Sequence, residues 1–268
     1  MAPLFILQFH REAKMYSGYF IAKDNTKLFY HITGSGQDHV VLLHGGLGDS
    51  REMAPVLYAL DRNKFTFIAP EFRGHGRSYH GELPLSYELY AEDVFGILDQ
   101  LGVENASVIG FSDGAITGIV MGYQQPKRIK TVVAIAPDSG QTGWNEEINL
   151  HEAFAEIARD EEMRNDYKSL SPEPDKFDSL LDSLKSLWLS PVHINPEKMG
   201  EIEAFCWFVA SERDEFMKLE DIKMLCNKVP KAEMVVLPDL KHGELTPVLA
   251  ELSRGNRHVL SDMLERRN

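Results

Sequence analysis

Short runs of apolar residues alternate with longer amphipathic stretches along most of this chain. From Gly18 onward the apolar runs have the length of buried strands, and the stretches between them carry apolar residues at helical spacing. This alternation is typical of a mostly parallel sheet with helices on both faces. The sequence therefore predicts an α/β fold built on an eight-stranded, mostly parallel sheet.

The pattern also gives approximate positions for the elements. Strands are expected at 19–23, 27–33, 39–43, 65–69, 106–109, 129–136, 204–210 and 233–237. Helices are expected at 50–60, 86–101, 113–125 and 218–229, with a last helix after residue 244. The turn pair Asp24-Asn25 joins the first two strands into a hairpin, and Pro126 ends the helix before it.

The alternation is interrupted between residues 141 and 201. This stretch has acidic helical pieces at 151–164 and 177–189, separated by several prolines. We expect a helical cap inserted at 141–201 into a core domain formed by 15–140 and 202–268.

The first 14 residues precede the strand pattern and leave three interpretations open. They are an extension, a region before a later start, or a strand docked elsewhere. Their apolar run, Pro3 to Phe9, follows no basic region and is followed by His10-Arg11-Glu12 instead of a cleavage site, so it does not resemble a secretory signal. We therefore expect a cytoplasmic protein.

Composition narrows the class of partner. The 268 residues carry a formal net charge of −13, which disfavours binding to nucleic acid or an anionic membrane. No apolar run approaches the length of a membrane-spanning helix. The two cysteines, Cys206 and Cys226, lack metal-ligand spacing and are expected to be buried free thiols. A small-molecule substrate is the expected partner, and self-association stays open.

The candidate chemistry centres on Gly110-Phe111-Ser112-Asp113-Gly114. Gly-x-Ser-x-Gly alone is a weak signal, but here it lies between a predicted strand and a predicted helix. That context is the one in which a sharp turn exposes a serine as a nucleophile, with glycines where the chains pass closely. The sequence predicts Ser112 as the nucleophile.

A serine hydroxyl needs a base to accept its proton and an acid to orient that base. Asp214 and His242 follow Ser112 in the order acid, then histidine, and each lies in a loop after a predicted strand. Such loops gather at the carboxyl edge of a parallel sheet. His242 is the predicted base. Asp214 and Asp138, which also ends a strand, are the two candidates for the acid.

Two backbone N–H groups are needed to stabilise the oxyanion of an acyl-transfer intermediate. Asp113, the residue after the nucleophile, supplies the first. Gly46, in the loop that follows strand 39–43, is the choice for the second, with Leu47 as its alternative.

Several separate motifs occur together in the order found in the α/β-hydrolase superfamily, which the chain resembles from Gly18 to its end. They are His44-Gly45-Gly46, the run Phe72-Arg73-Gly74-His75-Gly76-Arg77-Ser78, the serine motif, the loop with Asp214, and Leu240-Lys241-His242. The resemblance implies an acyl hydrolase, most similar to carboxylesterases. Its chain order favours Asp214 as the predicted acid, with Asp138 as the alternative, and it gives His44 and the 72–78 run structural roles.

Within that superfamily, residues 111–117 and 123–129 are similar to the valacyclovir hydrolase, or biphenyl hydrolase-like, group. The resemblance implies that Asp113 faces the amine of an amino-acid ester. The chain differs from the group at Ala115, where a second glycine is usual. Independently of any relative, an acidic residue at this position suits the first turn of a helix.

Four residues are candidates for substrate contact: Leu47, Phe111, Trp144 and Trp188. The two tryptophans either line an acyl pocket or pack the cap on the core, and the sequence does not separate these roles. No metal-ligand cluster or phosphate-binding loop is present, so no metal and no cofactor are expected. The rival to an esterase is a non-catalytic ligand-binding protein on the same fold, and rivals within the fold are a C–C bond hydrolase, an aminopeptidase and an acyltransferase.

Overall fold

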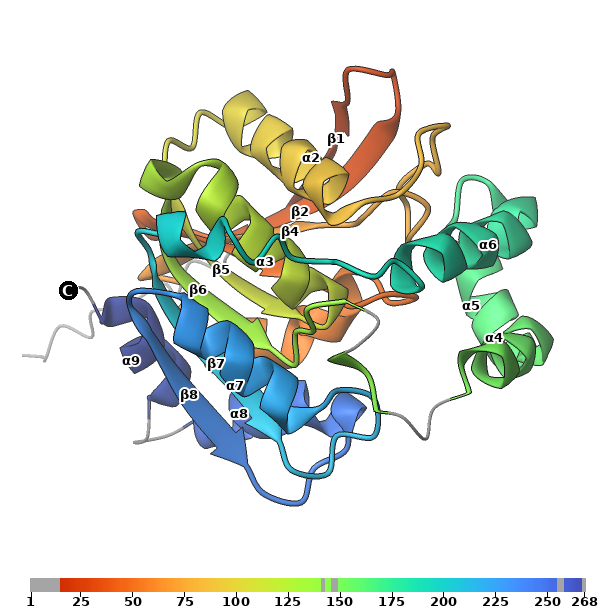
Figure 1. The fold of residues 1–268 in the computed structure, drawn as a ribbon. Helices are drawn as coiled ribbons and strands as arrows, with labels where there is room; N and C mark the ends of the chain where they lie inside the picture. Colours follow the sequence, from red (N-terminus) through yellow and green to blue (C-terminus); the bar gives the residue numbers. More distant parts are fainter. Residues whose placement is uncertain (1–14, 141–142, 146–148, 255–257, 267–268) are drawn as a thin grey trace, which may run out of the picture.

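The computed structural model describes residues 15–140, 143–145, 149–254 and 258–266. The predicted extension at 1–14 lies outside these residues. One sheet of eight strands, in the order β1-β2-β4-β3-β5-β6-β7-β8, forms the centre of the molecule (Figure 1). Pairing is antiparallel between β1, β2 and β4 and parallel through the rest of the sheet. The predicted mostly parallel, eight-stranded α/β fold is confirmed.

The strands lie close to their predicted positions. They are β1 (Tyr16–Ile21), β2 (Lys27–Gly34), β3 (Asp38–Leu43), β4 (Phe65–Pro70), β5 (Ala106–Phe111), β6 (Ile129–Ile135), β7 (Phe205–Ser211) and β8 (Ala232–Leu237). All six residues of β5 are buried, as are the last four of β3. Both strands are covered on two faces, which is why they read as continuous apolar runs instead of alternating ones.

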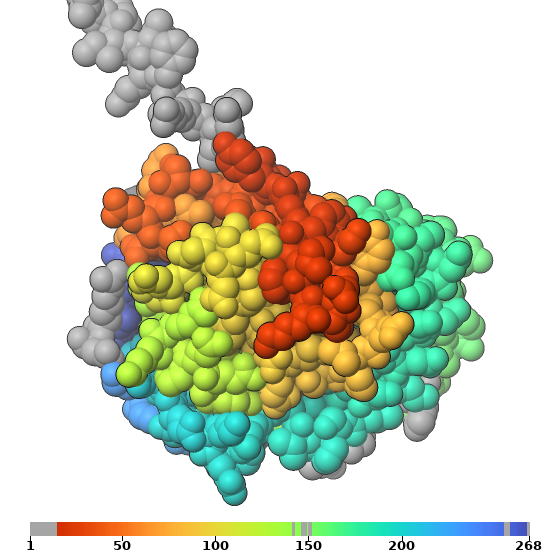
Figure 2. Space-filling view, turned by 90° about the horizontal axis from the view of Figure 1, so that it is seen from above, coloured from red at the N-terminus to blue at the C-terminus, as the bar shows by residue number. Residues whose placement is uncertain are grey.

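Helices cover both faces of the sheet. The core helices are α1 (Ala54–Ala59), α2 (Tyr87–Gln100), α3 (Asp113–Gln124), α7 (Leu219–Lys228), α8 (Leu245–Leu252) and α9 (Val259–Glu265). Helix α2 packs on α3 on one side, and α1 packs on α8 on the other. Phe20 of β1 lies against Gly96 of α2, where a Cβ would come within 2.3 Å of its ring, so the hairpin lies on that helix (Figure 2).

The helices differ from the sequence prediction in three places. The expected helix at 50–60 is a 3₁₀ turn, η1 (Ser50–Met53), followed by the short α1, whose first turn contains Pro55. The expected helical piece at 151–164 belongs to two helices, because the Asp160 side chain accepts the Met163 N–H and begins a second one. Helix α9 follows the predicted last helix and was not expected.

Helices α4 (Leu150–Arg159), α5 (Glu161–Leu170) and α6 (Phe177–Trp188) form a group beyond the ends toward which the central strands point (Figure 1). Shorter 3₁₀ turns are η2 (Pro126–Arg128), η4 (Pro174–Lys176), η5 (Met199–Glu201) and η6 (His242–Glu244). Trp144 pairs with Met217 in an isolated antiparallel bridge, which joins the stretch before α4 to the loop after β7. No helix in the described part of the chain is long and apolar enough to cross a membrane.

Candidate active site

Ser112 occupies the turn between β5 and α3. Its backbone has φ 52° and ψ −119°, a region that L-residues rarely adopt. The flanking glycines make this turn possible, because a Cβ on Gly110 would lie 2.1 Å from the Gly114 carbonyl oxygen. A Cβ on Gly114 would lie 2.3 Å from the carbonyl oxygen of Leu43. Both glycines of the motif are therefore required by close backbone approach, as the sequence predicted.

The main chain holds this turn in place from both sides. The Ser112 N–H donates to the Ile135 carbonyl at 2.8 Å, which ties the elbow to strand β6. The Ser112 carbonyl accepts the N–H groups of Ala115 and Ile116, the first bonds of α3. The serine therefore stands at the positive end of a 12-residue helix, where developing negative charge is favoured.

His242 and Asp214 are joined by a hydrogen bond of 2.8 Å between Nδ1 and Oδ2. The Asp214 side chain is fully buried, and its other oxygen accepts the backbone N–H groups of Phe216 and Met217 at 2.9 and 3.0 Å. Because a carboxylate only accepts, Nδ1 of His242 carries a proton and Nε2 of the neutral ring is free to take one. This is the orientation that a general base requires.

Asp138, the alternative acid, is bound to a different histidine. Its Oδ1 lies 2.5 Å from Nδ1 of His193, and it also accepts the Gly140 N–H at 2.8 Å. The second ring nitrogen of His193 lies 3.1 Å from the Leu187 carbonyl oxygen. Both ring nitrogens therefore face acceptor atoms, an arrangement that favours the protonated, imidazolium form of His193 beside Asp138. Burial lowers the pKa of His193, but the hydrogen bond to Asp138, the charges of Asp138 and Asp113 and the bond to the Leu187 carbonyl together outweigh burial, so the pKa is raised.

A pocket of about 290 Å³ brings the predicted site residues together. Ser112 and His242 both line it, and Asp214 lies behind His242. The predicted oxyanion donors and substrate contacts line it as well: Gly46, Asp113, Leu47, Phe111, Trp144 and Trp188. The helical segment adds Ala153, Phe154 and Ile157, and the core adds Glu52, Phe216 and Met217.

The chain from residue 38 to residue 175 matches the family described as alpha/beta hydrolase fold, which is over half of its length. The chain belongs to this family. Human serine hydrolase BPHL is 28% identical over 143 residues, which are 52% of this chain and 48% of that protein. The α/β hydrolase described here thus spans about half the length of that relative.

Solved structures of low sequence identity share the fold of this α/β hydrolase. The 2-hydroxy-6-oxo-6-phenylhexa-2,4-dienoate hydrolase BphD from Rhodococcus sp. strain RHA1 has a TM-score of 0.75 at 17% identity, covering 95% of this chain and 100% of the other. The enol-lactonase from Burkholderia xenovorans LB400 has a TM-score of 0.71 at 18% identity, covering 93% and 100%. At these identities the likeness concerns the fold alone.

The predicted oxyanion loop of this hydrolase is tightly held. His44 is buried, and burial lowers its pKa to about 4, so the ring is neutral. Its Nδ1 donates to the Gly45 carbonyl at 2.7 Å, and its Nε2 accepts the Phe72 N–H at 3.0 Å. Leu47 follows with φ 63°. A Cβ on Gly46 would lie 2.4 Å from the Trp188 ring, so only glycine fits there.

The side chain of Asp113 does not cap α3, in contrast to the simplest sequence interpretation. Its carboxylate accepts the Tyr87 hydroxyl at 2.9 Å and the Trp188 indole N–H at 3.0 and 3.1 Å. Burial raises the pKa of Asp113 to about 6, although these two hydrogen bonds act in the opposite direction. Asp113 therefore joins the turn at Ser112 to the end of α6.

The arginines of the run 72–78 form ion pairs with other residues of the protein. Arg73 is buried and bonds the carboxylates of Asp24 and Asp93, while Arg77 bonds Glu71. These ion pairs connect the hairpin, β4 and α2, in agreement with the structural role that the resemblance implied for this loop.

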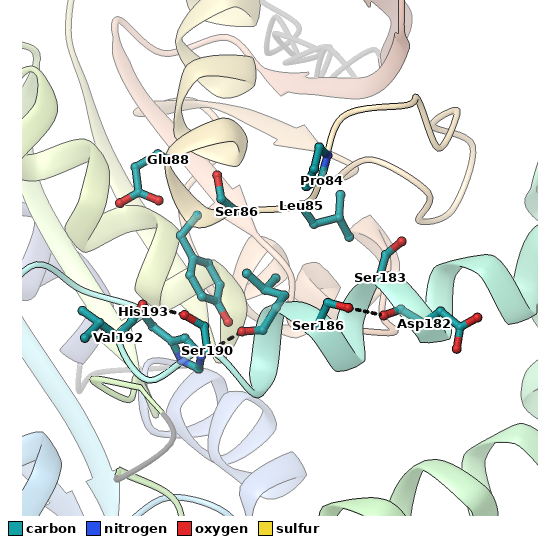
Figure 3. A pocket seen from close by; sticks show the side chains of 12 residues that line it. Pro84, Leu85, Ser86, Glu88, Asp182, Ser183, Ser186, Ser190, Val192 and His193 are labelled. Atoms are coloured by element: carbon teal, nitrogen blue, oxygen red, sulfur yellow. Dashed lines mark hydrogen bonds between the residues drawn. The ribbon is translucent and has the colours of Figure 1, made fainter.

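A second pocket, of about 490 Å³, lies on the other side of Tyr87. Figure 3 shows Ser86 at the start of α2 opposite Ser186 of α6, with His193 nearby. It contains none of the three predicted catalytic residues, so the smaller pocket around Ser112 is the candidate site.

Sequence reasoning did not single out Glu52, Tyr87 or His193. Glu52 lines the candidate site, and Tyr87 bonds Asp113 in its wall. His193 bonds the carbonyl of Leu187, the residue before Trp188 of that wall. None of the three lies in a local motif, so the sequence carried no signal for them. Phe216 and Met217, which lie two and three positions after Asp214, could have been found from the loop position alone.

Proposed function

We propose that this chain is a serine hydrolase that cleaves a small carboxylic ester, or a related acyl bond, through Ser112, His242 and Asp214. The observation that carries the proposal is one pocket that holds Ser112 on a strained strand-to-helix turn together with a histidine hydrogen-bonded to a buried aspartate. Family membership and the likeness to serine hydrolases support hydrolytic chemistry.

The reaction proceeds by acyl transfer to water. Nε2 of His242 takes the Ser112 proton as Oγ attacks the acyl carbon, and Asp214 stabilises the imidazolium that forms. The N–H groups of Gly46 and Asp113 stabilise the oxyanion, and removal of one such donor costs about 3 kcal/mol of transition-state stabilisation. His242 returns the proton to the leaving group, and water then hydrolyses the acyl-enzyme by the same steps.

The inserted segment at 141–201 acts as a cap that selects the acyl or leaving group. Phe154, Ile157 and Trp188 from its helices lie in the same pocket as Ser112. The pocket volume of about 290 Å³ is at the low end for ligand sites, which favours a small substrate.

Recognition of a substrate amine by Asp113 is the finer question. Tyr87 and Trp188 already donate to both of its oxygens, which supports a role in fixing the pocket wall over a role in binding an amine. Comparing an α-amino ester with its deaminated analogue tests this directly. If Asp113→Ala raises KM for the amino ester alone, amine recognition is correct. Equal effects on both esters would mean that Asp113 only fixes the pocket wall.

A fluorophosphonate probe tests the nucleophile. Labelling of the wild-type protein but not of Ser112→Ala, together with turnover of p-nitrophenyl esters, is the expected result. Absence of both labelling and turnover would refute the hydrolase and favour a non-catalytic ligand-binding protein. A panel that adds a C–C substrate, an aminopeptidase substrate and an acyl acceptor separates the remaining rivals within the fold.

The acid is tested by a matched pair of variants. Asp214→Asn is expected to lose several orders of magnitude in kcat, because the wrong tautomer of His242 is then held. Asp138→Asn serves as the control, since Asp138 is bonded to His193. Loss of turnover in the Asp138 variant alone would mean that the acid is wrongly assigned.

Cytoplasmic location and self-association stay predictions.

A further inference from the structure

Glu52 brings a carboxylate into the candidate active site from an element outside the serine motif. It lies on the 3₁₀ turn η1 and lines the pocket beside Ser112 and His242. Its Oε2 accepts the Gly45 N–H at 2.6 Å. A Cβ on Gly48 would come within 2.8 Å of the same oxygen, so the carboxylate is packed against both ends of the turn that carries Gly46.

The two bonds to this loop determine the direction of the Gly46 N–H. Glu52 holds the N–H of Gly45, and Nδ1 of His44 holds the carbonyl of Gly45. In a trans peptide the carbonyl and the following N–H point in opposite directions. With the Gly45 carbonyl directed at His44, the Gly46 N–H is directed away from it. Glu52 and His44 thus hold the peptide unit that contains the proposed oxyanion donor, the Gly46 N–H, and the peptide unit before it.

The carboxylate of Glu52 also lies in the same pocket as the proposed base. Three carboxylates surround His242: Asp214 at Nδ1, Glu215 at the backbone N–H at 2.9 Å, and Glu52 across the pocket. Asp49 and Asp113 lie close enough to repel Glu52. Among the residues that the structure describes, no lysine or arginine forms an ion pair with Glu52. Burial raises the pKa of Glu52, while the Gly45 N–H and His242 oppose that rise.

We propose that Glu52 is a positioning residue of the hydrolytic reaction, holding the Gly45 peptide so that the Gly46 N–H meets the oxyanion and stabilising the His242 imidazolium by its charge. The inference rests on the proposed function. Glu52 itself forms no bond with the substrate in this role, so its effect falls on kcat and on the pH profile instead of on KM.

Two substitutions separate the hydrogen bond from the charge. Glu52→Gln keeps an oxygen that can accept the Gly45 N–H but removes the charge. Glu52→Leu removes both. Glu244→Gln is the matched control, because it removes one carboxylate from an exposed position two residues after His242. Thermal unfolding of each variant checks that it is folded. If Glu52→Leu does not fold, the comparison of Glu52→Gln with the wild-type protein still tests the proposal.

The readouts are kcat and KM for a p-nitrophenyl ester between pH 5 and 9, with the rate of fluorophosphonate labelling. We expect Glu52→Gln to lower kcat about threefold to tenfold and to move the acidic limb of the kcat/KM profile to lower pH by about 0.5 to 1 unit. Glu52→Leu should lose roughly a further tenfold in kcat. The Glu244→Gln limb should shift less, because solvent screens that charge.

Three results would overturn the proposal. They are an unchanged acidic limb in Glu52→Gln, a shift equal to that of Glu244→Gln, or an effect confined to KM. If wild-type protein is labelled and Ser112→Ala is not, such a result refutes the role of Glu52 alone. If wild-type protein is neither labelled nor active, the proposed function fails and the role of Glu52 fails with it.

Discussion

The strained backbone of Ser112 gives a prediction about stability that is independent of catalysis. Ser112→Gly and Ser112→Ala both remove the hydroxyl, so neither retains the nucleophile. They differ in the backbone, because glycine adopts φ 52°, ψ −119° readily and alanine does not. Ser112→Gly should therefore give a more stable protein than Ser112→Ala.

The magnitude follows from two opposing free-energy terms. Holding an L-residue in a sparsely populated region costs about 1 to 3 kcal/mol, which glycine avoids. Glycine gains freedom in the unfolded chain, which lowers stability by about 0.4 to 1 kcal/mol. The net expectation is that Ser112→Gly is more stable than Ser112→Ala by about 0.5 to 2 kcal/mol. For a domain of this size the difference in Tm is roughly 1 to 8 °C.

Urea unfolding of the two variants, followed by circular dichroism at pH 7, measures the difference. The m-values should agree, so that the change in midpoint reports stability alone. If Ser112→Gly is no more stable than Ser112→Ala, the turn stores no strain and the argument from φ is wrong. Activity cannot confound the comparison, since both variants lack the hydroxyl.

Other predictions concern packing and buried charge. Gly114→Ala should destabilise the protein by several kcal/mol, about 3 or more, because its Cβ meets backbone; Gly122→Ala in the same helix, with ordinary contacts at 3.4 Å, should be neutral or stabilising by urea unfolding. The pKa of Asp113 is raised to about 6 in the folded protein, so folding is favoured while this carboxyl is protonated. As pH rises from about 4 to 6 the proton is lost, and the free energy of unfolding should fall by about 3 kcal/mol. Asp113→Asn should remove that slope from unfolding measured across this range, and an unchanged slope would contradict the assignment. The raised pKa of His193 means that its ion pair with Asp138 stabilises the fold below about pH 6.5 and is lost as pH rises through the folded value. His193→Gln should flatten the loss of stability as pH rises above about 6.5. An equally steep loss in that variant would show that another group is responsible.

Local sequence determined the elements and the strand-to-helix turn at Ser112 of this protein. The apolar runs that became β3 and β5 predicted buried strands, because strands covered on both faces have no polar period. Gly110 and Gly114 predicted close backbone approach at Ser112, since only glycine allows it at those positions. Both signals lie within a few residues of the structure that they determine, which is why they can be read from the chain.

The tertiary structure decided the side-chain partners. Asp138 and Asp214 follow the neighbouring strands β6 and β7, so strand order alone could not assign the acid. Only the folded structure shows that Asp138 is bonded to His193 and Asp214 to His242. Asp113 meets Trp188 from 75 positions away, and Glu52 reaches the site from a turn without a motif. Hydrophobic periodicity reports which face of an element is buried, whereas polar partners are chosen by long-range packing that no local pattern records.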